Sequence, residues 1–231
     1  MIIAKGIVIN EERISRQSRM VRDVYMPSLK LELDHPVLEE REPKIGKIFG
    51  QLAESFSILG LEQCVGQGDI KLAKQFFYNS AVARLRHALE YQDGAKSFYV
   101  RGISVSFESI FCDATHLHPL FAKVRHPDLK AIEGKSSWLS YVLVTLYQQS
   151  LVKNWNQVRA LISEIESNGV LEKNKWFEED LAVYRALCDD DSVAVEKALS
   201  SLLVASSVKK RNRDFKDTSL GKFMCSPGMW F

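Results

Sequence analysis

The chain has little of what most metal and redox sites need. Its 231 residues include only 4 cysteines and 5 histidines. The cysteines stand far apart and form no CxxC pair, which argues against a zinc ribbon or a redox motif. In a reducing compartment such residues are usually buried free thiols, and we expect that here. They are Cys64, Cys112, Cys188 and Cys225.

The short motifs of common enzyme classes are also missing. There is no GxSxG elbow, no GxxxxGK[ST] phosphate loop, no GxGxxG and no HExxH. Adjacent carboxylates, such as Glu11-Glu12 and Glu39-Glu40, fall at expected helix ends or in polar segments. Solvation or the helix dipole explains them better than acid–base catalysis. We predict a protein that is not an enzyme and that uses no cofactor.

Charge of one sign and long apolar runs are absent as well. Lys and Arg total 31 and Asp and Glu 29, a formal charge of +2 that argues against a broad nucleic-acid-binding field. No apolar run approaches the roughly 18 residues that a membrane span needs. The opening MIIAKGIVIN has too short an apolar stretch for a signal peptide. We expect a cytoplasmic protein with no nucleic-acid or membrane partner.

Amphipathic helical spacing covers most of the chain. The hydrophobic share of 46% can form a core, and apolar residues recur every three or four positions. We predict an all-α fold, with residues 1–231 forming one compact domain of stacked helical hairpins. The predicted helices are 11–24, 44–64, 70–91, 120–125, 137–151, one between Asn154 and Gly169, 175–188, and one after Ser192.

Two segments have less regular patterns. Residues 27–43 contain three prolines and many acids, which indicates a loop-rich connection. Residues 95–115 fit either strands or an interrupted buried helix, and their helical surroundings favour the helix.

The C-terminal half contains a weak internal repeat. Trp138 and Trp176 are 38 positions apart, and each is followed by a tyrosine, a polar break and a second amphipathic helix. This pattern is typical of stacked helical hairpins.

Potential metal ligands gather in one stretch, at Cys112, Asp113, His116, His118 and His126. They form no complete ligand set with standard zinc spacing. Because His118 and His126 each precede a proline, turns around a short helix are the better interpretation.

Two basic segments are equally open to simple explanations. Arg13, Arg16, Arg19 and Arg22 follow one drifting helix face, where pairing with Glu11, Glu12 and Asp23 is favoured over an acidic partner. The basic residues at 209–213 follow an expected helix, and the dipole at a helix C-terminus favours cations there. We also expect the final aromatics, Trp230 and Phe231, to pack onto the last helices.

Four stretches of the C-terminal part together resemble a known family. They are Trp138 to Leu161, Trp176 to Leu203, the break at Lys209 to Asp214, and the apolar segment from Phe223 to Pro227. This pattern of helices is similar to the immunity protein 49 family of bacterial polymorphic toxin systems. The resemblance implies a helical cytoplasmic protein that binds and neutralises a cognate toxin domain, such as a nuclease, in stoichiometric amounts. It transfers no catalytic residue.

Acidic residues are the candidates for toxin binding, because nuclease toxins have basic clefts. They are Glu178, Glu179, Asp180, Asp189, Asp190 and Asp191. A solvated acidic face is the simpler reading of each. Two other functions stay open: a helical-repeat adaptor or scaffold, and a metal-dependent enzyme using Cys112, His116, His118 and His126.

Overall fold

A computed structural model of the chain describes residues 11–33, 42–90, 107–124 and 138–202, except positions 168, 174 and 176. The regular structure in this part of the chain is helical and contains no strand, which confirms the all-α prediction. No helix within it is long and apolar enough to cross a membrane. The predictions for Cys225, His126, the basic run at 209–213, and Trp230 and Phe231 lie outside the described residues.

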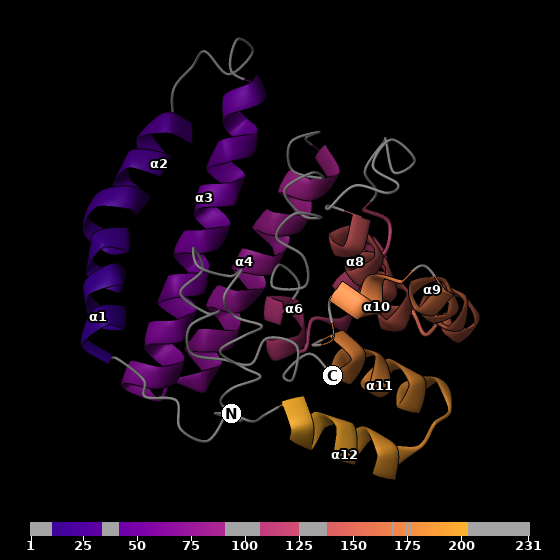
Figure 1. Cartoon of the computed structure of the whole chain (residues 1–231). Helices are drawn as coiled ribbons and strands as arrows, with labels where there is room; N and C mark the ends of the chain where they lie inside the picture. Colours follow the sequence, from indigo (N-terminus) through magenta and orange to yellow (C-terminus); the bar gives the residue numbers. More distant parts are fainter. Residues whose placement is uncertain are drawn as a thin grey trace.

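Long helices form the N-terminal half, on the left of Figure 1. A continuous helix is followed by an antiparallel pair, in which the chain turns at Gly68, with a φ of 71°. Asp69 then caps the second helix of the pair, accepting the N–H of Leu72 at 2.9 Å. The elements are α1 (Glu11–Met20), η1 (Val21–Tyr25), α2 (Met26–Leu33), α3 (Glu42–Leu61), η3 (Glu62–Gln67) and α4 (Ile70–Glu90).

The predicted loop-rich connection at 27–43 is wrong for residues 27–33, which are helical, and residues 34–41 lie outside the described part. Pro27 follows the π-helical η1, where the N–H of Met26 donates to the carbonyl of Val21, five residues back. This shift in hydrogen bonding lets a residue without an N–H continue the helix. Pro43 is the second residue of α3, where the N–H has no acceptor within the helix.

Short helices connect the two halves of the molecule. They are α6 (Phe107–Phe111), η5 (Thr115–Leu117) and α7 (His118–Phe121). The helical prediction for 95–115 is confirmed for residues 107–111, residues 112–114 are not helical, and residues 95–106 lie outside the described part. The helix expected at 120–125 instead spans His118–Phe121, because Pro119 occupies its first turn rather than preceding it, and residues 122–124 are not helical. Phe121 packs in one apolar cluster with Leu85 of α4 and with Val144 of α8, the helix Trp138–Leu151.

The C-terminal half consists of two stacked hairpins, on the right of Figure 1, with α12 below α11. Tyr147, Tyr184 and Ile165 are fully buried between them. Gln148 ties the first hairpin to α7, since its Nε2 donates to the carbonyls of Phe121 and Val124, both at 2.7 Å. The elements are α8 (Trp138–Leu151), α9 (Trp155–Ser167), α10 (Val170–Lys173), α11 (Phe177–Cys188) and α12 (Ser192–Leu202).

Candidate functional site at the hairpin turns

The turns of the two hairpins share one conformation. The second residue after each first helix has a positive φ, 55° at Lys153 and 54° at Asp190. Its N–H and the next N–H bond to carbonyls three and five residues earlier, the Schellman arrangement that satisfies a helix C-terminus. These equivalent residues are 37 positions apart, as are the buried Tyr147 and Tyr184. The structural repeat is therefore 37 residues, one fewer than the spacing of the tryptophans suggested.

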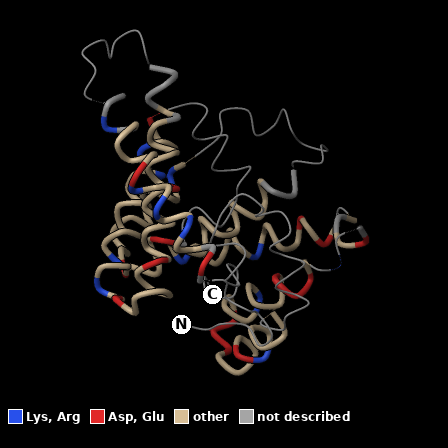
Figure 2. Tube along the Cα trace, turned by 90° about the vertical axis from the view of Figure 1, so that its left-hand side faces the viewer, with Lys and Arg blue, Asp and Glu red and all other residues tan. Residues whose placement is uncertain are grey.

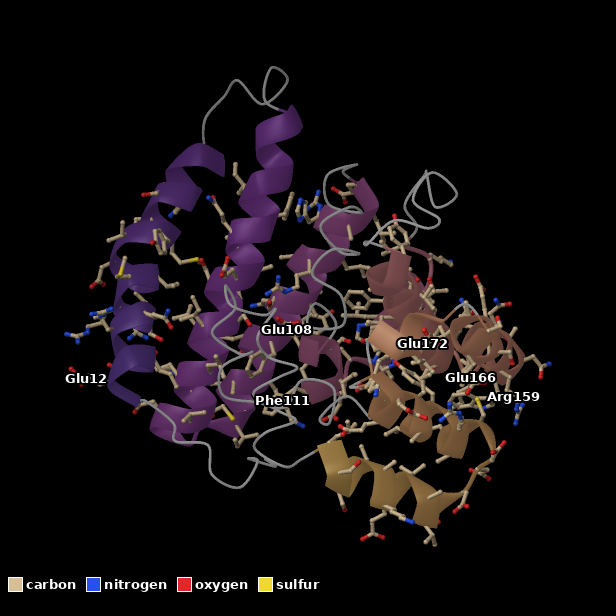
Figure 3. The ribbon with its side chains drawn as sticks, viewed as in Figure 1. Glu12, Glu108, Phe111, Arg159, Glu166 and Glu172 are labelled. Carbon is tan, nitrogen blue, oxygen red and sulfur yellow. The ribbon has the colours of Figure 1, made fainter. Side chains whose placement is uncertain are left out.

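The second turn packs against the first hairpin. Arg159 of α9 donates to the backbone carbonyl of Cys188 and lies 3.5 Å from the Asp189 carboxylate. Figure 3 shows Arg159 at the outer edge of this half. A depression separates the two turns and is lined by Ser150, Leu151, Lys153, Trp155, Leu187, Cys188 and Asp190.

Three of the acidic candidates lie together at this turn. Asp189, Asp190 and Asp191 are all exposed. Asp191 also caps α12, because its Oδ1 accepts the N–H of Ala194 at 2.9 Å. These carboxylates are on the surface and available to a partner.

The other three acidic candidates lie at the opposite end of α11. A helix of 12 residues, at about 1.5 Å per residue, separates the two groups by roughly 15 Å. Glu178 is exposed, Glu179 is half-buried and Asp180 is buried. Burial, and then the Asp180 carboxylate, raise the pKa of Tyr184 well above its usual value. Asp180 therefore faces the core, and the six acids do not form one surface.

The potential metal ligands follow α6. His116 is exposed, with Nε2 3.5 Å from the Tyr78 hydroxyl, and Cys112 is half-buried. Burial, and then His116, lower the pKa of His118. Within the described ranges, no three His, Cys, Asp or Glu side chains are grouped so that they could hold a metal ion.

The arginines along one face of the first helix differ in their contacts. Arg16 and Arg19 are exposed, whereas Arg22 forms a two-pronged ion pair with the buried Glu62 of η3. One prong joins Nη2 to Oε1 at 2.8 Å. Sequence reasoning had favoured pairing with acids of the same helix, but the partner comes from another element. The pair joins the two π-helical segments, η1 and η3.

A buried polar cluster is the site that sequence reasoning missed. Glu108 of α6 is fully buried between α3 and α4, in the centre of Figure 3. Its Oε1 accepts from Ser57 at 3.1 Å, Ser80 at 3.3 Å and Arg84 at 3.0 Å. Its Oε2 has no hydrogen-bond partner among the described residues. Burial raises the pKa of Glu108 despite the opposing effect of Arg84.

A sequence signal for this cluster does exist. Ser80 and Arg84 are spaced i, i+4 beside the apolar stripe that contains Phe77, Ala81 and Leu85. Polar residues at such positions are buried with the stripe and need partners. The pattern does not identify Glu108 as the partner, because it lies 24 residues beyond Arg84.

Among the residues that the structure describes, charge of both signs is spread along the trace and no large region carries one sign alone (Figure 2). The candidate surface is thus defined by local features: two turns, a depression and three exposed carboxylates. Comparisons of the chain with models of protein families, with curated proteins and with solved structures found no match.

Proposed function

We propose that this protein is a cytoplasmic immunity protein that binds and neutralises a cognate toxin domain. The observation that carries the proposal is the pair of adjoining hairpin turns, which present a depression beside Asp189, Asp190 and Asp191. The resemblance of the C-terminal helices to the immunity protein 49 family supplies the type of partner. The proposal involves binding alone and requires no catalytic step.

The turn surface has features that suit protein binding. Val193, at the start of α12, is 75% exposed, and Val152, beside the first turn, is 40% exposed. Apolar side chains flanked by carboxylates can contribute contact energy at the centre and electrostatic steering at the rim. Effective protection requires nanomolar affinity, about −12 kcal/mol, which an interface on the order of 1,600 Å² can provide.

Co-expression with the adjacent toxin gene in a sensitive host tests the proposal. Protection should follow dose and approach completeness at one immunity protein per toxin, and the complex should survive size-exclusion chromatography. If the cells die as fast with this protein as without it and no complex is found, the immunity proposal is wrong.

The acidic surface has a separate test. Changing Asp189 and Asp190 to Lys should slow association with a basic toxin, and the slowing should diminish at high salt. Changing Glu164 and Glu172 to Lys, two exposed acids outside the candidate set, is the matched control. An association rate for the turn variant equal to that of the wild type would exclude a role for the turn carboxylates.

A helical adaptor is the second candidate function, and the 37-residue repeat of stacked hairpins favours it. Repeats of this kind present extended surfaces to protein partners. Stable capture of a partner in cells that contain no toxin gene, together with failure to protect, would favour the adaptor.

A further inference from the structure

The two hairpins are equivalent in structure but differ in how well their second helices are covered. Val158 and Ile162 of α9 are buried, at 0% and 5% exposed. Their equivalents in α12, 37 positions later, are Val195 and Leu199, and both are only half-buried. Leu202, equivalent to Ile165, is fully buried, so α12 is docked at that end. Val195 and Leu199 therefore form a partly exposed apolar strip on α12, whereas the equivalent strip on α9 is buried.

A depression coincides with this strip. It lies between α11 and α12, and its lining includes Leu187, Asp190, Val195, Glu196 and Leu199. Of these described lining residues, the charged ones are Asp190 and Glu196, and both are acidic. Leu187 and Asp190 also line the depression between the two turns, which makes this groove continuous with the candidate surface.

The first hairpin shows what kind of element covers such a strip. Helix α9 is covered by α11, and Ile162 and Leu181 belong to the same buried cluster. An element in the same position against α12 would be a helix with an apolar face. Since the rim of the groove is acidic, basic residues beside that face would complement it.

We propose that the groove between α11 and α12 is a docking site for an amphipathic helix whose apolar stripe is flanked by lysine or arginine. The helix is contributed by the toxin domain, so this inference rests on the proposed function and specifies the partner's binding element. The apolar stripe covers Val195 and Leu199, and the basic residues lie against Asp190 and Glu196.

A peptide experiment on the full-length protein tests the chemistry of the groove. The probe is a labelled helix-forming peptide of about 18 residues, with Leu at i, i+3, i+4 and i+7 spacing and Lys elsewhere. A peptide with Glu in place of Lys and a scrambled Leu/Lys peptide are the probe controls. Fluorescence anisotropy should show the Leu/Lys helix binding more tightly than either control.

Two substitutions locate the binding in the groove. Leu199→Gln should lower the affinity for the Leu/Lys peptide by about tenfold. Ser201→Gln, on the same helix but outside the groove, should leave that affinity unchanged. Glu196→Gln should weaken it by about threefold at low salt and less at high salt, with Glu164→Gln on α9 as control. Because Glu196 is exposed, Glu196→Gln should not unfold the protein. This variant therefore still tests the groove if Leu199→Gln fails to fold.

Three results would overturn the inference. The first is equal binding of all three peptides, or no effect of either groove variant. The second is failure of the full-length protein to bind the peptide while Leu199→Gln lowers its thermal midpoint, which would mean that the chain's own residues fill the groove. The third is a dimer by light scattering that Leu199→Gln dissociates, which would assign the groove to a second copy.

The toxin domain itself separates this inference from the proposed function. Toxin that binds the wild type and Glu196→Gln with equal affinity and equal salt dependence overturns the groove assignment but leaves the immunity proposal intact. Absence of any toxin binding overturns the immunity proposal. Peptide selectivity that depends on Leu199 and Glu196 would then still support a docking site for a basic helix from another partner.

Discussion

Burial makes the charge state of Glu108 part of the stability of the fold. The carboxylate is surrounded by three helices, and only its Oε1 is paired within the described residues. A buried ion pair repays its desolvation only when its geometry satisfies the groups around it. Removing one partner of the Arg84 pair should therefore cost more stability than the intact pair contributes.

The pH dependence of stability should reveal this group. Since the pKa of Glu108 is higher in the folded than in the unfolded state, its contribution to stability is fully present below the unfolded value and is lost as pH rises through the folded value. Urea unfolding of wild type and Glu108→Gln should show the wild type gaining relative stability as pH falls from about 8 to about 5. A difference between the two proteins that does not change with pH would contradict the raised pKa.

The Arg22–Glu62 pair predicts a second effect at the residue scale. Arg22→Ala leaves the buried Glu62 carboxylate without its two-pronged partner and should lower the free energy of unfolding by about 1–3 kcal/mol. Arg16→Ala removes an exposed arginine of the same helix and should change it by less than about 0.5 kcal/mol. Equal urea midpoints for the two variants would show that the pair contributes nothing.

At the scale of elements, α3 and α4 approach closely at Gly60. A Cβ at this position would lie 2.9 Å from the ring of Phe77, which is fully buried. That ring is also held edge-on by Phe111, with 4.8 Å between the ring centroids. The close packing of α3 against α4 therefore requires glycine at position 60, although alanine is the better helix former.

Two glycine substitutions test this dependence. Gly60→Ala should lower the free energy of unfolding by about 1–3 kcal/mol, because the ring cannot move without losing its own contacts. Gly66→Ala should be neutral or stabilising by up to about 1 kcal/mol, because among the described residues the atom nearest to an added Cβ is Glu62 Cγ, at 3.8 Å. Thermal melts of both variants provide the comparison, and a neutral Gly60→Ala would mean that α3 and α4 separate easily.

At the scale of the whole molecule, one apolar cluster joins the two halves. Leu85 of α4, Phe121 of α7 and Val144 of α8 belong to it. Gln148 adds hydrogen bonds between α7 and α8. Because the halves share this core, separate unfolding would expose it on both sides.

The tryptophans make that coupling measurable. All 4 lie at position 138 or later, so tryptophan fluorescence reports on the C-terminal half, whereas circular dichroism reports on helices throughout the chain. We expect a helix-dominated spectrum and urea transitions that coincide for the two probes, as cooperative unfolding requires. A fluorescence transition distinct from the dichroism transition would show two independent units instead of one domain.

Local patterns were enough to predict most of the described helices. The apolar spacing of the longer helices depends on residues within a turn or two of one another. These helices are α3, α4, α8, α9, α11 and α12. Such interactions are encoded in adjacent sequence and need no knowledge of the fold. The repeat of helical hairpins is encoded in the same way. Its exact length of 37 residues, however, is defined by the backbone conformation of the two turns.

Only the tertiary structure decided which polar residues are buried and with what partner. Glu108 and Arg84 are 24 residues apart, and Arg22 and Glu62 are 40 apart, so neither pair is visible in local spacing. The burial of Asp180 similarly depends on how α11 packs against its neighbours. Helices form through contacts along one segment, whereas charge pairing and exposure are fixed by which segments meet, and folding alone brings those segments together.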